Sequence, residues 1–108
     1  MSKNQVVLVG RLGQDPDVKE FEFGKIAQLN VATSESYKNN LGEWVEDTQW
    51  HKVVAKGKWA EFAAEHLAKG KEICLNGRLT YRSYEDKNKE RKYVSEVVVS
   101  DLFMVARN

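Results

Sequence analysis

The side chains of this sequence that could do chemistry are flat rings and long cations rather than nucleophiles. All three tryptophans lie in residues 33–59, together with Tyr37 and four lysines. Aromatic rings stack on bases and ammonium groups bind phosphates, so this combination suits a single nucleic-acid strand. The alternative is that the rings are ordinary core residues. Their positions on the predicted elements have to separate these two interpretations.

Residues typical of catalytic or metal sites are few and scattered. His51 and His66 stand apart from any nucleophile, and the single cysteine, Cys74, has no Cys or His at metal-site spacing. The sequence contains no nucleophile elbow, glycine-rich phosphate loop or metal motif. It therefore predicts a binding protein without catalytic residues, metal or cofactor. An active site assembled from distant residues stays open as the alternative.

Length and composition indicate one globular domain. The chain has 108 residues, of which 42% are hydrophobic, and this gives room for one modest core over residues 1–108. No apolar run is long enough to cross a bilayer, and the start "MSKNQ" resembles neither a secretory signal nor a transit peptide. We therefore expect a cytoplasmic protein without a membrane partner.

The charges are unevenly distributed along a chain whose net charge is only +1. Residues 52–58 hold three lysines and no acid, and residues 78–92 hold six basic and three acidic side chains. The net charge thus argues against a uniformly basic protein that binds nucleic acid by charge alone. The pattern favours a local basic groove, although a solvated face of mixed charge would look similar.

Short β-branched runs separated by turn residues predict five strands, in residues 5–12, 25–34, 48–56, 72–84 and 92–106. Residues 37–47 are predicted to form a loop. The spacing of Trp59, Phe62, Ala63 and Leu67 predicts one amphipathic helix that ends with Gly70 as its cap. A helix between strands 3 and 4 of five is the order of an OB-fold, a mainly β, five-stranded Greek-key barrel.

Strand alternation predicts which rings face outward. In the third strand Trp50, Lys52 and Lys56 share one face, with Lys58 if the strand continues, while His51 and Val53 share the other. We therefore expect Trp50 to face solvent among lysines.

In the fourth strand Ile73, Leu75, Leu79 and Tyr81 are expected inside the barrel. The opposite set carries Arg78, Arg82 and Tyr84, which could hold phosphates and one base.

The remaining rings have different expected places. Trp59 lies on the apolar stripe of the helix and should anchor it to the core. Tyr37 is expected at the rim of the barrel, on the same lysine-bearing face as Trp50. Trp44 lies in the predicted loop and could stack on a base, cap the barrel or be mobile, and the sequence does not decide between these roles.

The run "VVLV" at residues 6–9 is apolar at both parities. A strand with one wet face should alternate, so this run favours contact with another subunit, and we assign Val6 and Leu8 to that contact. The alternative is a strand buried within one barrel.

The segments "VVLVGRLGQDP", "LNVATSESY", "TQWHKVVAKGKWAEFAAEHLAKG", "ICLNGRLTYRSY" and "YVSEVVVSDLFMV" together resemble the DNA-binding domain of bacterial-type single-stranded DNA-binding proteins. This resemblance implies an OB-fold, single-stranded DNA as partner in replication, recombination and repair, no cofactor, a homotetramer and a place at the nucleoid. A flexible tail with an acidic tip, common in the family, is expected to be absent because the chain stops at Asn108, so tail-mediated partners are not expected.

By position, the resemblance implies base stacking by Tyr37, Trp50 and Tyr84, backbone contacts by Lys52, Lys58 and Arg82, and a subunit contact at His51. Relatives often carry an aromatic residue where Lys56 stands. DNA binding by this protein is therefore expected to depend more on salt, and less on stacking, than in those relatives.

Two alternatives to sequence-tolerant DNA binding stay open. One is an OB-fold adaptor of the primosome type, whose barrel serves assembly first and nucleic acid second. An adaptor has no need of rings in register with lysines. The other is an RNA-binding OB module, which only relative affinity for matched DNA and RNA strands would separate.

Overall fold

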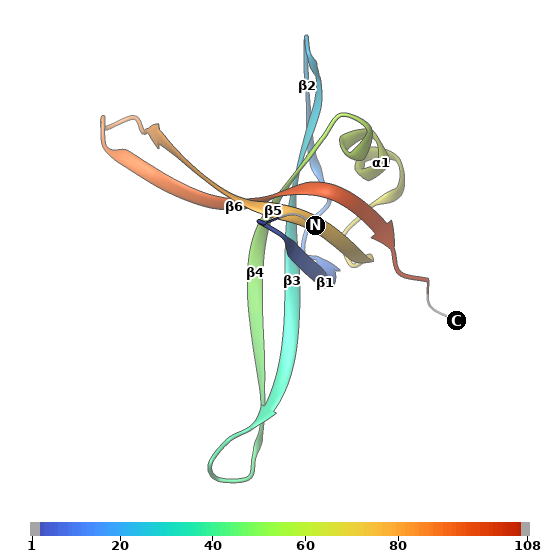
Figure 1. The fold of residues 1–108 in the computed structure, drawn as a ribbon, viewed down its shortest axis with the longest axis vertical. Helices are drawn as coiled ribbons and strands as arrows, with labels where there is room; N and C mark the ends of the chain where they lie inside the picture. Colours follow the sequence, from blue (N-terminus) through green and yellow to red (C-terminus); the bar gives the residue numbers. More distant parts are fainter. Residues whose placement is uncertain (1–2, 107–108) are drawn as a thin grey trace.

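Strands dominate the computed structural model, which describes residues 3–106. The elements in chain order are β1 (Val6–Leu12), β2 (Asp17–Phe21), β3 (Gly24–Lys38), β4 (Trp44–Lys56), α1 (Lys58–His66), β5 (Glu72–Glu85) and β6 (Arg91–Met104). Figure 1 shows a small barrel with α1 beside it and two long ribbons that leave it in different directions.

The sheet closes into a barrel of OB-fold topology. The strand order is β1-β5-β6-β4-β3-β2, and β1 returns to pair with β3 at Arg11↔Ala32 and Leu12↔Val31. The pairing of β4 with β6 is parallel, whereas the other pairings are antiparallel. The five expected strands are β1, β3, β4, β5 and β6, and α1 lies between the third and fourth of them, so the predicted fold is confirmed.

Strand β2 is an addition that alternation did not predict. Its sequence "DVKEF" offers one aliphatic side chain, Val18, which packs against the core. Pairing with β3 along its whole length forms this strand, from Asp17↔Gln28 to Phe21↔Gly24. The strand therefore depends on its partner rather than on its own hydrophobic pattern.

One residue parity of each barrel strand fills the core. The fully buried aliphatic side chains include Leu29, Val31, Val53, Ile73 and Leu75. Helix α1 covers one end of this core with Ala60 and Ala63. Burial of this kind contributes roughly 25 cal/mol per Å² of apolar surface, which makes the barrel the stable part of the molecule.

Trp59 anchors α1 to the barrel, as its position on the apolar stripe predicted. Its ring is half-buried against the core and meets the Phe62 ring edge-on, with centroids 6.1 Å apart. Its indole Nε1–H donates to the carbonyl oxygen of Ser100 in β6, at 3.1 Å. The polar atom of this half-buried ring is thus satisfied.

The helix is shorter than the sequence predicted. It ends at His66, and the next residue, Leu67, is extended and turns its side chain into the core. Asp15 accepts a hydrogen bond from the backbone N–H of Lys69 at 2.8 Å, which ties the segment after the helix to the segment after β1. Gly70 lies beyond the helix end and does not cap it.

Two long ribbons extend past the barrel, formed by β3 with β4 and by β5 with β6, and the β2–β3 hairpin also projects from it (Figure 1). The β3–β4 ribbon turns at residues 39–43, where the Asn39 side chain accepts hydrogen bonds from the N–H groups of Leu41 and Glu43. The expected loop at 37–47 is therefore too long, and Trp44 begins a strand. Asp86 closes the β5–β6 ribbon in the same way, through the N–H groups of Asn88 and Glu90.

Across residues 3–106, α1 is too short and too polar to cross a bilayer.

Candidate nucleic-acid interface

The outer face of β2, β3 and β4 carries the residues that alternation turns away from the core. Pairing brings these residues into rows across the sheet, because directly opposed residues share a face. The rows are Ala32↔Trp50, Asn30↔Lys52, Asp17↔Gln28↔Val54 and Lys19↔Ile26↔Lys56.

Trp50 has a defined place on this face. It is 64% exposed, which confirms the predicted outward orientation. Its six-membered ring lies so close to Gly13 that a Cβ atom there would overlap it, and Gln14 and Asn30 complete a shallow hollow beside the ring. Asn30 donates to the Gln14 side-chain oxygen at 3.2 Å, which joins β3 to the segment after β1. The ring is thus supported on one side and open on the other.

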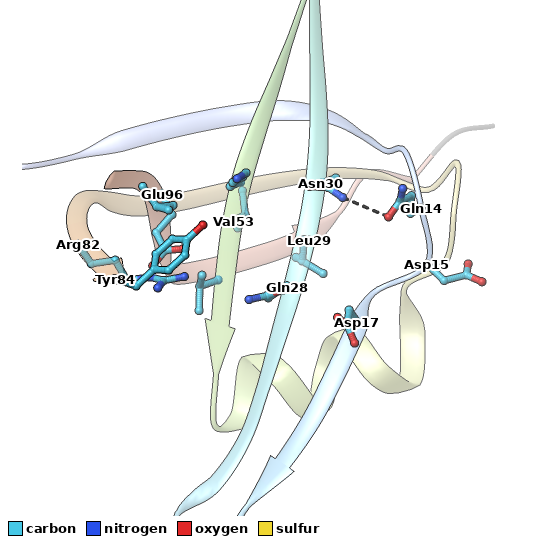
Figure 2. A pocket seen from close by; sticks show the side chains of 13 residues that line it. Gln14, Asp15, Asp17, Gln28, Leu29, Asn30, Val53, Arg82, Tyr84 and Glu96 are labelled. Atoms are coloured by element: carbon cyan, nitrogen blue, oxygen red, sulfur yellow. Dashed lines mark hydrogen bonds and ion pairs between the residues drawn. The ribbon is translucent and has the colours of Figure 1, made fainter. Parts of the chain in front are cut away.

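A groove of about 460 Å³ lies next to Trp50. Figure 2 shows Arg82, Tyr84 and Glu96 on one wall, Gln14, Asp15 and Asp17 on the other, and Gln28, Leu29 and Val53 along the floor. Lys52 also lines it. The groove therefore brings together β3, β4 and the base of the β5–β6 ribbon, and with them Lys52, Arg82 and Tyr84.

Arg82 is held by a carboxylate. Its Nε lies 2.9 Å from Oε1 of Glu96, and the Glu96 side chain is only 11% exposed. The guanidinium carbon stands 5.9 Å from the centroid of the Tyr84 ring. Arginine has several N–H donors, so contact with a phosphate is compatible with this ion pair. The pair fixes Arg82, and with it Tyr84, on the groove wall.

The groove is less basic than the linear charge pattern predicted. Asp15, Asp17 and Glu96 line it together with the cations of Lys52 and Arg82. These acids are far from the lysines in sequence and reach the groove only through barrel closure. A phosphate is favoured at the Trp50 and Lys52 end, since the Asp17 carboxylate repels anions at the other end.

Tyr37 and Trp50 lie on opposite sides of the β3–β4 ribbon, which corrects the prediction that they share a face. Trp50 opposes Ala32, whereas Tyr37 is five residues further along β3, opposite Val45. An odd spacing reverses the face. Trp44, six residues before Trp50 in β4, is on the Trp50 side and is exposed.

Tyr81 is exposed, although its parity predicted an interior position. The core ends near Leu79, and beyond this point β5 has only β6 beside it. Tyr93 is also exposed, shares the Tyr81 side of the ribbon through Ser83↔Tyr93, and lines a second hollow with Trp50 and Lys52. The sequence analysis did not single out Tyr93, although its position in the alternating pattern of β6 could have indicated it.

The remaining predicted cations lie at different places. Lys56 is exposed beside Ile26 and Lys19. Lys58 is not on the β4 face, because Gly57 (φ 59°) redirects the chain and the Lys58 ammonium lies 5.0 Å from the centroid of the Trp59 ring. Arg78 is exposed opposite Val98, which adjoins Val54 of β4.

The β1 residues predicted to contact another subunit face the core, and their neighbours in the strand are exposed instead. Val6 and Leu8 pack against the barrel core, and the exposed apolar residues of the strand are Val7 (60%) and Val9 (55%). Their outer face continues through Cys74 to Phe103 of β6. The His51 ring is hydrogen-bonded through Nε2 to Oγ1 of Thr33 at 2.8 Å.

Known proteins share both the sequence and this architecture. The chain is 39% identical over 104 residues to single-stranded DNA-binding protein 1 of Chlorobaculum tepidum, covering 94% of this chain and 64% of the relative. It spans less than two thirds of that protein's length.

Two solved structures superpose closely on this fold. The Plasmodium falciparum SSB in complex with ssDNA gives a TM-score of 0.88 at 28% identity, covering 98% of this chain and 97% of that one. A deletion mutant of the Thermus aquaticus single-stranded DNA binding protein gives 0.83 at 31% identity, covering 95% of this chain and 50% of that one. The model of the single-strand binding protein family matches residues 3–105, and the chain belongs to this family.

Proposed function

We propose that this protein binds single-stranded DNA without sequence preference and without catalysis. The observation that carries the proposal is the exposed Trp50 ring, which is supported by Gly13 and lies in the row next to Lys52, a residue that lines the groove. Every base offers a π face, so a fixed ring binds any sequence, and cations add a salt-dependent contact with phosphates. Family membership and the DNA-bound Plasmodium relative support the same function.

The strand would follow the outer sheet face. Trp50 stacks on one base, Lys52 contacts the adjoining phosphate, and Tyr84 closes the groove wall with Arg82. Lys56 and Arg78 extend the contact across the sheet, and Lys58 contributes from the start of α1.

Tyr37 joins this interface only for DNA that passes around an edge of the β3–β4 ribbon, since its ring lies on the reverse side from Trp50.

The same proposal includes a homo-oligomer, in keeping with the tetramers typical of the family. Its support is the exposed apolar surface of Val7 and Val9, which continues to Phe103. Contiguous apolar patches of this kind mark protein contacts in soluble proteins. Val7 and Val9 are the side chains that β1 presents to a partner, and Val6 and Leu8 pack behind them against the core. His51 of β4 would be a separate contact. The oligomer would act in replication, recombination and repair at the nucleoid.

Titration of the intrinsic tryptophan fluorescence with oligo-thymidine at several salt concentrations tests the function. We expect quenching, and a fall of log affinity with log salt of about 0.7 per phosphate neutralised. The variant Trp50→Phe retains a ring and should keep most of the affinity while losing much of the quenching. Absence of binding at low salt would refute the proposal. A parallel titration with oligo-uridine separates a preference for DNA from one for RNA.

A further inference from the structure

An aromatic pair lies outside both the core and the groove. The rings of Phe21 and Phe23 are stacked, with centroids 5.1 Å apart and planes inclined by 5°. Phe21 is 44% exposed and Phe23 is 78% exposed, so neither ring is there to fill the barrel. Exposed phenylalanine is costly in water, and two of them held face to face present a flat, apolar surface to solvent.

The pair lies at the turn between β2 and β3, on the hairpin that Figure 1 shows extending past the barrel. Phe21 opposes Gly24, and the row two residues away is Lys19↔Ile26↔Lys56. Alternation therefore places Phe21 on the outer face that also carries Lys52 and Trp50. Gly24 is eight residues from Ala32, the partner of Trp50, or roughly 26 Å along the strand.

Two cations stand between the pair and the groove, whose near end carries the acid Asp17. Lys19 and Lys56 lie on the outer face between the rings and the groove. Glu20 opposes Lys25 on the reverse face, so its carboxylate does not border this path. Glu22, between the two rings in sequence, is the one acid of the turn itself. The hairpin thus offers rings at its end and two cations before them.

From this arrangement we infer that Phe21 and Phe23 form a second base-stacking platform, at the far end of a DNA path that starts at Trp50. The inference rests on the proposed function. The loop between the first two barrel strands is one of the regions with which OB-folds bind oligonucleotides. The rings are already stacked on each other, so a base that stacks on them immobilises little further side chain. Lys19 and Lys56 hold the phosphates between the platform and the groove.

Affinity measured against DNA length tests the platform. Labelled oligo-thymidines of about 8 and about 16 nucleotides lie within the range of single OB-fold sites. Phe23→Leu keeps an apolar side chain but removes the π face, whereas Phe23→Trp keeps a ring. We expect Phe23→Leu to weaken binding of the longer oligomer by about fivefold or more and to leave the shorter one unchanged. Phe23→Trp should bind both lengths like the wild type.

Phe21→Ala provides a second measurement, with thermal unfolding monitored to show that the hairpin change leaves the barrel folded. Phe23 is at the turn and highly exposed, so its variants carry the test if Phe21→Ala unfolds. If all Phe23 variants bound both oligomer lengths with the affinity of the wild type, the inference would be overturned, while the proposed DNA binding would stand. A change of oligomeric mass without a length-dependent loss would assign the rings to a protein contact, which also overturns it. A wild type that binds neither length contradicts the proposed function itself.

Discussion

The ring of Trp50 lies directly against Gly13, where a Cβ atom has no room. A residue of the segment after β1 therefore determines where a ring of β4 stands on the sheet surface. The consequence for binding is that the ring is held in position before DNA arrives, so that less side-chain freedom is lost on stacking.

Gly13→Ala should displace the Trp50 ring and weaken DNA binding about fivefold or more, since stacking of a base on an aromatic side chain contributes about 1–3 kcal/mol. The exposed ring can turn aside, so the melting temperature should change little. Fluorescence anisotropy of a labelled oligomer measures the affinity, and calorimetry measures the stability. Gly42→Ala, at a turn remote from the ring, serves as the control for a glycine change; it should cost stability through its positive φ and leave the Trp50 emission spectrum unaltered.

Trp50→Ala and Trp59→Ala should separate binding from stability. Loss of the Trp50 ring is expected to weaken binding by about 1–3 kcal/mol with little effect on unfolding. Loss of Trp59, which is half-buried and bonded to Ser100, should lower the free energy of unfolding by up to about 3 kcal/mol. Chemical denaturation and DNA titration of both variants give the comparison. The roles would be exchanged if Trp59→Ala kept its stability and lost its binding.

Lys56→Phe should make DNA binding depend less on phosphate contacts and more on stacking with bases. Removing one phosphate contact lowers the slope of log affinity against log salt by about 0.7, while the new ring adds stacking. We therefore expect weaker salt dependence and tighter binding at high salt. Lys71→Ala, a lysine outside the β2–β3–β4 sheet, should leave the slope unchanged. An unaltered slope in Lys56→Phe would show that this lysine contacts no phosphate.

Val9→Lys should dissociate the oligomer, because it places a charge in the exposed apolar face of β1. The barrel should stay folded, since Val9 does not face the core. Sedimentation velocity gives the mass, and circular dichroism confirms the fold. Leu41→Lys makes the same change at an exposed residue of the β3–β4 turn and should leave the mass unaltered. A wild-type monomer would contradict the proposed interface at once.

The spacing of apolar residues predicted the fold and the orientations of Trp50 and Trp59, because both residues lie where their strand or helix packs against the core. In β3, β4 and β5 every second residue is apolar because it is buried in the core, and the apolar stripe of α1 has the same cause. Closing five such strands around one core leaves few arrangements, which is why the OB-fold could be expected from the order of the elements.

Alternation failed to predict the exposure of Tyr81, and the reason is physical. Tyr81 lies on a ribbon that continues past the core, so the parity that is buried in the barrel meets water there. Alternation still assigns a side, but it no longer distinguishes inside from outside. The face of Tyr37 was mispredicted because it was inferred from its place at the rim, whereas counting residues along β3 puts it on the face opposite to that of Trp50.

Groove charge could not be predicted from linear clusters either, since Asp17 and Glu96 approach Lys52 only in the closed barrel.

The ribbons have a consequence for dynamics. In the β3–β4 ribbon, residues 33–49 are all described and none of them is buried. Its backbone ladder is therefore held by hydrogen bonds without a packed core behind them. Its amide protons should therefore exchange with solvent through local opening, far faster than those of Val31 or Val53, which need the barrel to unfold. A bound strand that lies along the ribbon would slow this exchange. Part of the favourable contact enthalpy is then offset by the entropy of stiffening the protein, and heat-capacity and exchange measurements would report that ordering even where the backbone does not move.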